Sequence, residues 1–417
     1  MLRSAPGTGA DSAILPGRLW PGTRFAILEG PVEASDYRWY RVQVGELTGW
    51  AAAGSNEGVP WMAAVRNGAI SFGGQPAADP LPQVFLIDPG GSDLRQLTHL
   101  TDADIALAVA LADDDPGALR PVLTCGFGLG GSWSPSGERF AFNVGSCDTV
   151  ILTVAADGSD LVHIADGRGM AWSNDGARLA YGLNIPYLVC GRACGGVELG
   201  PWDIQAAPAT GGPVASVSHG AAWEVAYGPI WSPSGGELAF TCGPIDGASS
   251  VCMVNSDGTD QRIVAAGSLL SLSPDGSRLV IRRTDAAGVS ELWVARADGS
   301  DEIILPGVGE AFPAAWSPDG QLIAMTVFGV AGAGPTTILI SPDGSASREL
   351  AAGSRFEAWA PDGRSVLVSG ISASEATTLY LVDVASGVIA PIVDLPSELI
   401  GGSSGFAWQP LVEYSLH

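Results

Sequence analysis

The 417-residue sequence contains no lysine, so all 20 of its basic residues are arginine, against 44 aspartate and glutamate residues. The formal net charge is −24, and the longest basic run is the pair Arg282-Arg283. A protein that binds nucleic acid or an anionic membrane surface needs a cluster of positive charge. The composition therefore argues against a nucleic-acid partner.

Long apolar segments are also missing. The longest apolar run, IALAVALA, covers residues 105–112, which is well short of a membrane-spanning helix, so we expect no transmembrane segment. Only 15% of the residues are charged while 46% are hydrophobic, and this balance excludes disorder as the main state. The 57 glycines and 29 prolines favour many turns between short strands.

One sequence motif occurs six times. Its copies are WSPSGERFAF, WSNDGARLAY, WSPSGGELAF, LSPDGSRLVI, WSPDGQLIAM and WAPDGRSVLV, which begin at Trp133, Trp172, Trp231, Leu272, Trp316 and Trp359. The copies start 39 to 44 residues apart, except for one interval of 59 residues that implies an insertion. Such spacing is typical of repeats that form four strands each.

The motif predicts a turn between two strands. In Ser-Pro-Asp-Gly, proline stands where its fixed φ suits a type I turn, and glycine stands where φ is positive. A segment rich in β-forming residues follows, such as TTILIS at Thr336, and then a second turn, such as ADGSD at Ala156 or Ala297. One unit is therefore an inner strand that carries the tryptophan, followed by three more strands.

These repeats resemble the TolB-type, or WD40-like, β-propeller repeat over residues 61–411. The resemblance implies an all-β, seven-bladed β-propeller of four-stranded antiparallel blades. AISF, QVFLID and GGSDLRQLT, which begin at Ala69, Gln83 and Gly90, lack an inner strand. FAWQP at Phe406 is an inner strand without a blade, so we expect this C-terminal strand to close the ring. WMAAV at Trp61 is the alternative inner strand.

Two insertions, at residues 100–121 and 184–201, fall in loops that share one face of a propeller, which makes that face the candidate binding face. Aromatic residues near the insertions offer a platform for a peptide or a sugar, and two histidines lie in loops of the same face. The ligand-face candidates are Tyr187, Trp202, Trp223, Tyr227, His219 and His99. No metal or cofactor is expected, because no histidine or cysteine spacing of a metal site is present.

The first sixty residues differ from the repeats. LRSAPGTG at residues 2–9, ILPGRLWPGTRFAILEGP at 14–31 and the WYRVQV and TGW segments resemble a bacterial SH3-type (SH3b) domain that lacks its first strand. The expected domains are thus an SH3-like β-barrel over 1–60, the propeller over 61–411 and a tail over 412–417. We expect an export signal or lipid anchor encoded upstream of Met1; the alternative is a deliberately shortened chain.

Six cysteines are compatible with three local disulfides. On the repeat pattern the expected pairs are Cys125 with Cys147, Cys190 with Cys194 and Cys242 with Cys252. Disulfides imply an oxidising, extracytoplasmic compartment, whether secreted, periplasmic or attached to the envelope. The alternative is that the cysteines are buried free thiols that fill space.

The sequence shows no convincing catalytic motif. Residues 401–405 match Gly-x-Ser-x-Gly, but they precede the closing strand instead of joining a strand to a helix. We therefore expect a non-enzymatic extracytoplasmic binding or scaffold protein that recognises a protein, a peptide or a cell-envelope ligand at its loop face. The SH3-like module is the candidate for targeting cell-wall material. The alternative is a propeller-fold hydrolase or lyase with carboxylates at the mouth of the channel.

Overall fold

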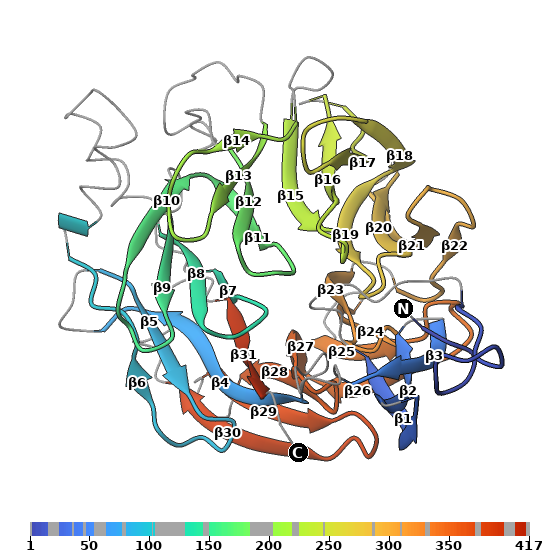
Figure 1. Ribbon diagram of the computed structural model, residues 1–417. Coiled ribbons are helices and arrows are strands. Elements are labelled where there is room, and N and C mark those ends of the chain that lie inside the picture. Colours follow the sequence, from blue (N-terminus) through green and yellow to red (C-terminus); the bar gives the residue numbers. More distant parts are fainter. Residues whose placement is uncertain are drawn as a thin grey trace.

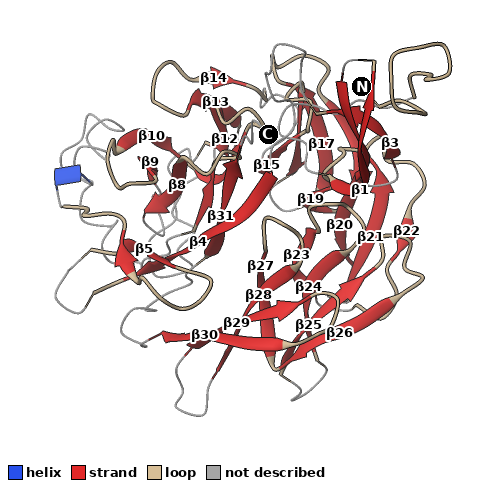
Figure 2. Ribbon diagram, turned by 60° about the horizontal axis from the view of Figure 1, so that its bottom comes forward, coloured by secondary structure: helices blue, strands red, loops and turns tan. Residues whose placement is uncertain are grey.

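The computed structural model is all-β. It describes seventeen segments of the chain: residues 2–15, 25–35, 37–44, 47–53, 64–76, 81–101, 103–104, 130–144, 150–183, 203–218, 225–244, 247–285, 288–308, 311–329, 334–371, 377–395 and 405–413. The described strands form seven four-stranded antiparallel sheets and one three-stranded sheet (Figures 1 and 2).

The first three four-stranded sheets come from the N-terminal half of the chain, together with its last strand. Their strands are β31 (Phe406–Glu413), β4 (Ala64–Gly74), β5 (Gln83–Ile87) and β6 (Arg95–Gln96); β7 (Gly131–Trp133), β8 (Arg139–Val144), β9 (Val150–Ala155) and β10 (Val162–Asp166); β11 (Arg168–Trp172), β12 (Arg178–Gly182), β13 (Ile204–Pro208) and β14 (Ala215–Ser216).

The other four sheets follow in chain order, each a simple meander of consecutive strands. Their strands are β15 (Val225–Trp231), β16 (Glu237–Gly243), β17 (Ser250–Asn255) and β18 (Arg262–Ala266); β19 (Ser268–Leu272), β20 (Arg278–Thr284), β21 (Ser290–Arg296) and β22 (Ile303–Ile304); β23 (Ala311–Trp316), β24 (Ile323–Phe328), β25 (Pro335–Ile340) and β26 (Ser347–Ala352); β27 (Ser354–Trp359), β28 (Ser365–Ile371), β29 (Thr377–Asp383) and β30 (Ile389–Leu395).

The seven sheets are arranged in a ring (Figure 1). The first strand of each sheet, here called its inner strand, contacts the inner strand of the next sheet, and the cycle runs β7, β11, β15, β19, β23, β27, β31 and back to β7. Apolar side chains from adjacent sheets pack against one another: Phe140 and Leu152 of one sheet pack against Val84 and Leu86 of its neighbour. The core therefore lies between the sheets.

The repeated motif forms the turn from the inner strand to the second strand. The N–H of Gly137 donates to the carbonyl of Ser134 at 2.8 Å, and the Oγ of Ser134 accepts from the N–H of Arg139 at 3.1 Å. Gly137 has a φ of +75°, and a Cβ there would lie 1.9 Å from the carbonyl oxygen of Pro410 on β31. Glycine at this position thus serves both the turn and the close approach of the neighbouring sheet.

The C-terminal strand closes the ring, as predicted. β31 pairs antiparallel with β4, with Trp408 opposite Ile70 and Phe406 opposite Phe72. Gln409 of β31 donates from Nε2 to the carbonyl of Gly137 in the next sheet at 2.8 Å. The alternative was wrong, because Ala64 and Val65 of the WMAAV segment belong to β4 itself.

The three-stranded sheet lies near the N-terminus and consists of β1 (Ala26–Ala34), β2 (Tyr37–Val44) and β3 (Leu47–Ala52). Arg3 forms isolated bridges with Trp50 and Ile14, and a small core of its own contains the buried Leu2, Val42 and Ala51. In the described part of the chain, no helix is both long and apolar enough to cross a membrane.

One expected cysteine pair lies within the described residues. Cys242 of β16 and Cys252 of β17 form a disulfide with a Cα–Cα distance of 5.9 Å, and both side chains are fully buried. The bond crosslinks two neighbouring strands of one sheet. Cys125, Cys147, Cys190 and Cys194 lie outside the described residues.

Candidate functional site

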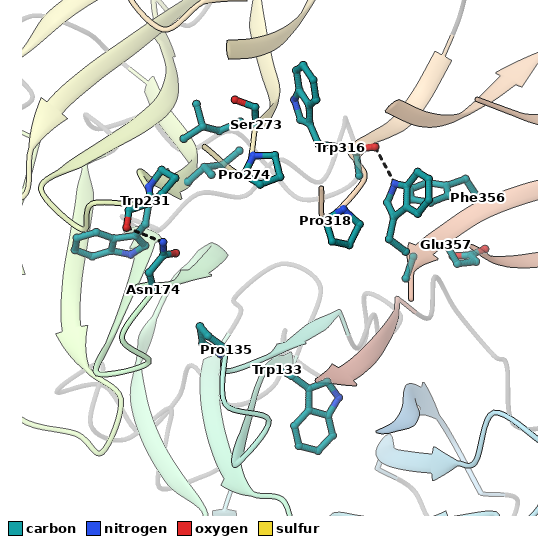
Figure 3. A pocket seen from close by; sticks show the side chains of 16 residues that line it. Trp133, Pro135, Asn174, Trp231, Ser273, Pro274, Trp316, Pro318, Phe356 and Glu357 are labelled. Atoms are coloured by element: carbon teal, nitrogen blue, oxygen red, sulfur yellow. Dashed lines mark hydrogen bonds between the residues drawn. The ribbon is translucent and has the colours of Figure 1, made fainter. Parts of the chain in front are cut away.

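The inner strands surround a pocket of about 460 Å³ (Figure 3). Its lining comes from inner strands and from the turns that follow them, such as Pro135, Pro274 and Pro318 of the repeated motif. Aromatic side chains contribute a large share of the wall. Those that line it are Trp133, Trp231, Trp316, Phe356 and Trp359.

A series of tryptophan hydrogen bonds connects neighbouring sheets around this pocket. Three Nε1 groups donate to the carbonyl of the residue that precedes the equivalent tryptophan in the previous sheet: Trp172 to Ser132 at 3.0 Å, Trp231 to Ala171 at 3.2 Å and Trp359 to Ala315 at 3.0 Å. Trp133 and Trp408 instead donate to Ser71 Oγ at 3.1 Å and to the carbonyl of Gly68 at 2.9 Å. The repeated tryptophan is therefore a structural residue that orders the inner strands.

The series is interrupted at Leu272, the one repeat copy that has no tryptophan. On either side of this position two buried polar atoms, Trp316 Nε1 and Ser271 Oγ, have no hydrogen-bond partner among the described residues. Leu272 offers no N–H to the carbonyl of Ile230, which is the equivalent acceptor.

Glu357 is the one titratable side chain among the described residues that line the pocket. It lies on β27, where the pairing with β28 shifts register between Phe356 and Ala358, so Glu357 is the extra residue of a β-bulge. The inner strands β11, β15, β19 and β23 show a register shift at the same place, so the bulge belongs to the repeat. Here the bulge residue lines the pocket (Figure 3).

The surroundings of Glu357 change its acidity. Burial raises the pKa of its carboxyl to about 7, while a hydrogen bond from Ser369 and the charge of Arg355 act in the opposite direction. The Oγ of Ser369, on the neighbouring strand β28, donates to Glu357 Oε1 at 2.5 Å. A carboxyl with a pKa near 7 exchanges a proton readily at neutral pH, which is the property of a general acid or base.

Sequence reasoning missed Glu357, although the repeat contains a signal for it. Two residues before the inner-strand tryptophan, or the leucine that replaces it, the other sheets carry only uncharged residues. These are Gly131, Met170, Pro229, Leu270, Ala314 and Phe406. Only one sheet has an acidic residue at this position. The fold does not require a charge there, because the other sheets form without one.

Two of the predicted ligand-face residues, Tyr227 and His99, lie within the described part of the chain. Tyr227 is 40% exposed near the start of β15, and His99 is exposed with Nδ1 at 3.2 Å from Gln96 Nε2. Neither lines the pocket. Tyr187, Trp202, His219 and Trp223 lie outside the described residues. Within the described part of the chain, no three His, Cys, Asp or Glu side chains form a group that would hold a metal ion.

No family model matches the sequence, and no curated protein matches it either. The arrangement of four-stranded sheets around one axis decides the architecture. The chain has a β-propeller fold. Similar solved structures include TolB from Acinetobacter baumannii, with 16% identity, a TM-score of 0.45 and coverage of 83% of this chain and 82% of that one.

Two further solved structures are more similar in fold, and both are enzymes. An oligogalacturonate lyase from Vibrio parahaemolyticus is 13% identical, with a TM-score of 0.54 over 84% of this propeller chain and 97% of the lyase. A prolyl endopeptidase is 12% identical, with a TM-score of 0.54 over 79% of this chain and 49% of the endopeptidase. The propeller chain thus spans about half the length of the endopeptidase.

These similarities correct the expected function. We expected a non-enzymatic binding or scaffold protein, but propeller enzymes are among the solved structures that resemble this chain with TM-scores above 0.5. The expectation was wrong because the residues of the repeat motif form turns. Enzymes and binding proteins of this fold need the same turns, so the motif does not distinguish them. The alternative, a propeller-fold hydrolase or lyase, is the better supported of the two.

Proposed function

We propose that this protein is a propeller-fold lyase that cleaves an oligosaccharide of uronic acids in the central pocket, with Glu357 as the group that transfers the proton. The observation that carries the proposal is a single, largely buried carboxyl in the pocket whose pKa is raised to about 7. Its role is general acid–base catalysis.

A single carboxyl group can carry out the proton transfer of an elimination reaction at a uronic acid. The base removes the proton from the carbon next to the sugar carboxylate, a carbon–carbon double bond forms, and the glycosidic carbon–oxygen bond breaks while the leaving oxygen takes up a proton. Hydrolysis of a glycosidic bond commonly uses a pair of carboxyl groups. The described lining of the pocket contains one, Glu357, which favours elimination.

The similarity in fold supports the same choice. The lyase from Vibrio parahaemolyticus is matched over 97% of its length, whereas the prolyl endopeptidase is matched over 49%. A reaction carried out by the propeller alone is therefore more compatible with the lyase. At 13% identity the similarity concerns the fold, so the assignment of the reaction depends on Glu357 and its surroundings.

The products of the reaction test the proposal. We expect the protein to split oligogalacturonate into fragments whose masses sum to that of the substrate and whose new double bond absorbs ultraviolet light. Fragments that have gained one water molecule would identify a hydrolase instead. Intact oligogalacturonate after prolonged incubation with folded protein would contradict the proposed substrate.

We also propose that the seven four-stranded sheets are the blades of one seven-bladed ring over residues 61–411, preceded by an SH3-type module over 1–60 and followed by a tail over 412–417. An extracytoplasmic location is supported by the Cys242–Cys252 disulfide. Limited proteolysis checks the domain limits: we expect cleavage near residue 60 to release a propeller that still melts cooperatively.

A further inference from the structure

Two arginines stack on exposed phenylalanines at one edge of three consecutive sheets. The guanidinium carbon of Arg282 lies 5.8 Å from the ring centre of Phe312, and that of Arg355 lies 5.8 Å from the ring centre of Phe328. Phe312 is 56% exposed and Phe328 is 40% exposed. Both rings thus remain accessible to solvent with an arginine beside them.

The four residues lie on the same face of the ring. Phe312 and Arg355 come near the starts of the inner strands β23 and β27, and Arg282 and Phe328 come near the ends of the second strands β20 and β24. Inner and second strands are antiparallel, so the start of one meets the end of the other. This face is opposite to the Ser-Pro-Asp-Gly turns, and we call these four residues the Arg–Phe surface.

Neither arginine of the Arg–Phe surface forms a salt bridge within the described residues, whereas the adjacent Arg283 pairs with Glu302. A guanidinium that lies against an aromatic ring keeps its N–H edge available for a carboxylate. The surface thus offers two forked donors to an anionic ligand.

The Arg–Phe surface is adjacent to Glu357. Arg355 precedes Glu357 by two residues on β27, which is about 7 Å of strand. The charge of Arg355 also acts on the Glu357 carboxyl. The pocket is lined by residues of the Ser-Pro-Asp-Gly turns, such as Pro318, and Arg355 lies on the other side of Glu357 along β27.

We infer that the Arg–Phe surface binds the carboxylates of an acidic oligosaccharide. Each uronic acid unit offers a carboxylate for an arginine and a C–H face for a phenylalanine ring. This inference deepens the proposed lyase function and rests on it for the class of sugar. The binding step itself is independent of catalysis.

Calorimetric titration with trigalacturonate, and with its uncharged methyl ester, tests the inference. Every protein in the titration also carries Glu357→Gln, so that the sugar is not cleaved during the measurement. We expect the acid to bind and the ester to bind at least tenfold more weakly. Arg282→Gln combined with Arg355→Gln is expected to weaken binding of the acid at least tenfold. The matched control is Arg364→Gln, because Arg364 is an exposed arginine of the same β27–β30 sheet in the turn on the opposite face; its affinity should stay within twofold.

The outcomes separate the inference from the proposed function. Arginine-dependent binding without any cleavage would leave the binding surface standing and refute the lyase. If cleavage requires Glu357 but the affinity is unchanged when both arginines are replaced, the binding surface is refuted and the lyase function is not. Three results would overturn the inference. The acid and the ester could bind with equal affinity, or the protein that keeps both arginines could fail to bind the acid. A polyglutamate peptide of similar charge could also displace trigalacturonate at a concentration lower than that of the sugar.

Discussion

The Oγ of Ser369 donates a hydrogen bond to Oε1 of Glu357 at 2.5 Å, across the first two strands of one propeller sheet. The bond partly offsets the effect of burial, which raises the pKa of the Glu357 carboxyl. Ser369 is itself buried, with 8% of its surface exposed. The pair therefore sets the fraction of Glu357 that is ionised at neutral pH.

Replacing Ser369 with alanine is expected to raise the pKa of Glu357 further, because the hydrogen bond that favours its charged form is lost. If Glu357 acts as the base, the acidic limb of the kcat/KM profile should move to higher pH by about one unit. The measurement is the pH dependence of oligogalacturonate cleavage. Threonine at this position keeps the hydroxyl, so Ser369→Thr should retain the wild-type profile, and a limb that moves equally in both variants would contradict this role.

Glu357 also makes stability depend on pH in a definite direction. Its pKa in the folded state is about 7, above the ordinary value of 4.5, so the folded state binds more protons between these values. The free energy of unfolding should therefore fall as pH rises from about 4.5 to 7, by on the order of 3 kcal/mol from this group. Denaturant unfolding of the wild type and of Glu357→Gln at several pH values isolates this contribution.

In that comparison, the stability of Glu357→Gln relative to the wild type should increase through the same pH window and level off above it. Glu349→Gln is the control, since Glu349 is exposed on β26. Parallel pH profiles for the wild type and Glu357→Gln would show that the carboxyl titrates normally.

The tryptophan hydrogen bonds predict unequal costs for two similar substitutions. Trp359→Phe leaves the carbonyl of Ala315 without its donor, whereas Trp316 Nε1 has no acceptor within the described residues to lose. Trp359→Phe should therefore reduce the free energy of unfolding by about 1–2 kcal/mol more than Trp316→Phe. Urea unfolding of the two variants decides it, and equal losses would argue that these hydrogen bonds contribute little.

The Cys242–Cys252 disulfide has a simple chemical test. The bond joins residues ten positions apart, and its removal in the Cys242→Ala, Cys252→Ala double variant should cost about 2–3 kcal/mol. Titration of thiols in the denatured, non-reduced protein should find one more thiol in Cys242→Ala than in the wild type, because Cys252 is released. One thiol fewer would mean that both cysteines are free in the wild type.

Much of the architecture could be predicted because its determinants are local. Turn residues such as Pro135 and Gly137 act within a few positions of the chain, so the Ser-Pro-Asp-Gly pattern shows where strands meet. Closure by β31 followed from the same reasoning, since FAWQP keeps the inner-strand pattern while Ala69 onwards lacks it.

The site could not be predicted in the same way. The acidity of Glu357 depends on burial and on Ser369, which is twelve residues away on another strand, and neither is visible in a local motif. Attention to the inserted loops led to Tyr227 and His99, which do not line the pocket. Comparison of equivalent repeat positions would have singled out Glu357, because the fold does not require a charge there.

The rate of oligogalacturonate cleavage by Glu357→Gln, measured beside Glu349→Gln, tests the central claim most directly. Glutamine keeps the size of the side chain and removes its ability to transfer a proton, so we predict a loss of at least about 100-fold in kcat/KM. Glu349→Gln should retain the wild-type rate, and both variants should melt cooperatively. A folded Glu357→Gln protein that cleaves at the wild-type rate would contradict the account.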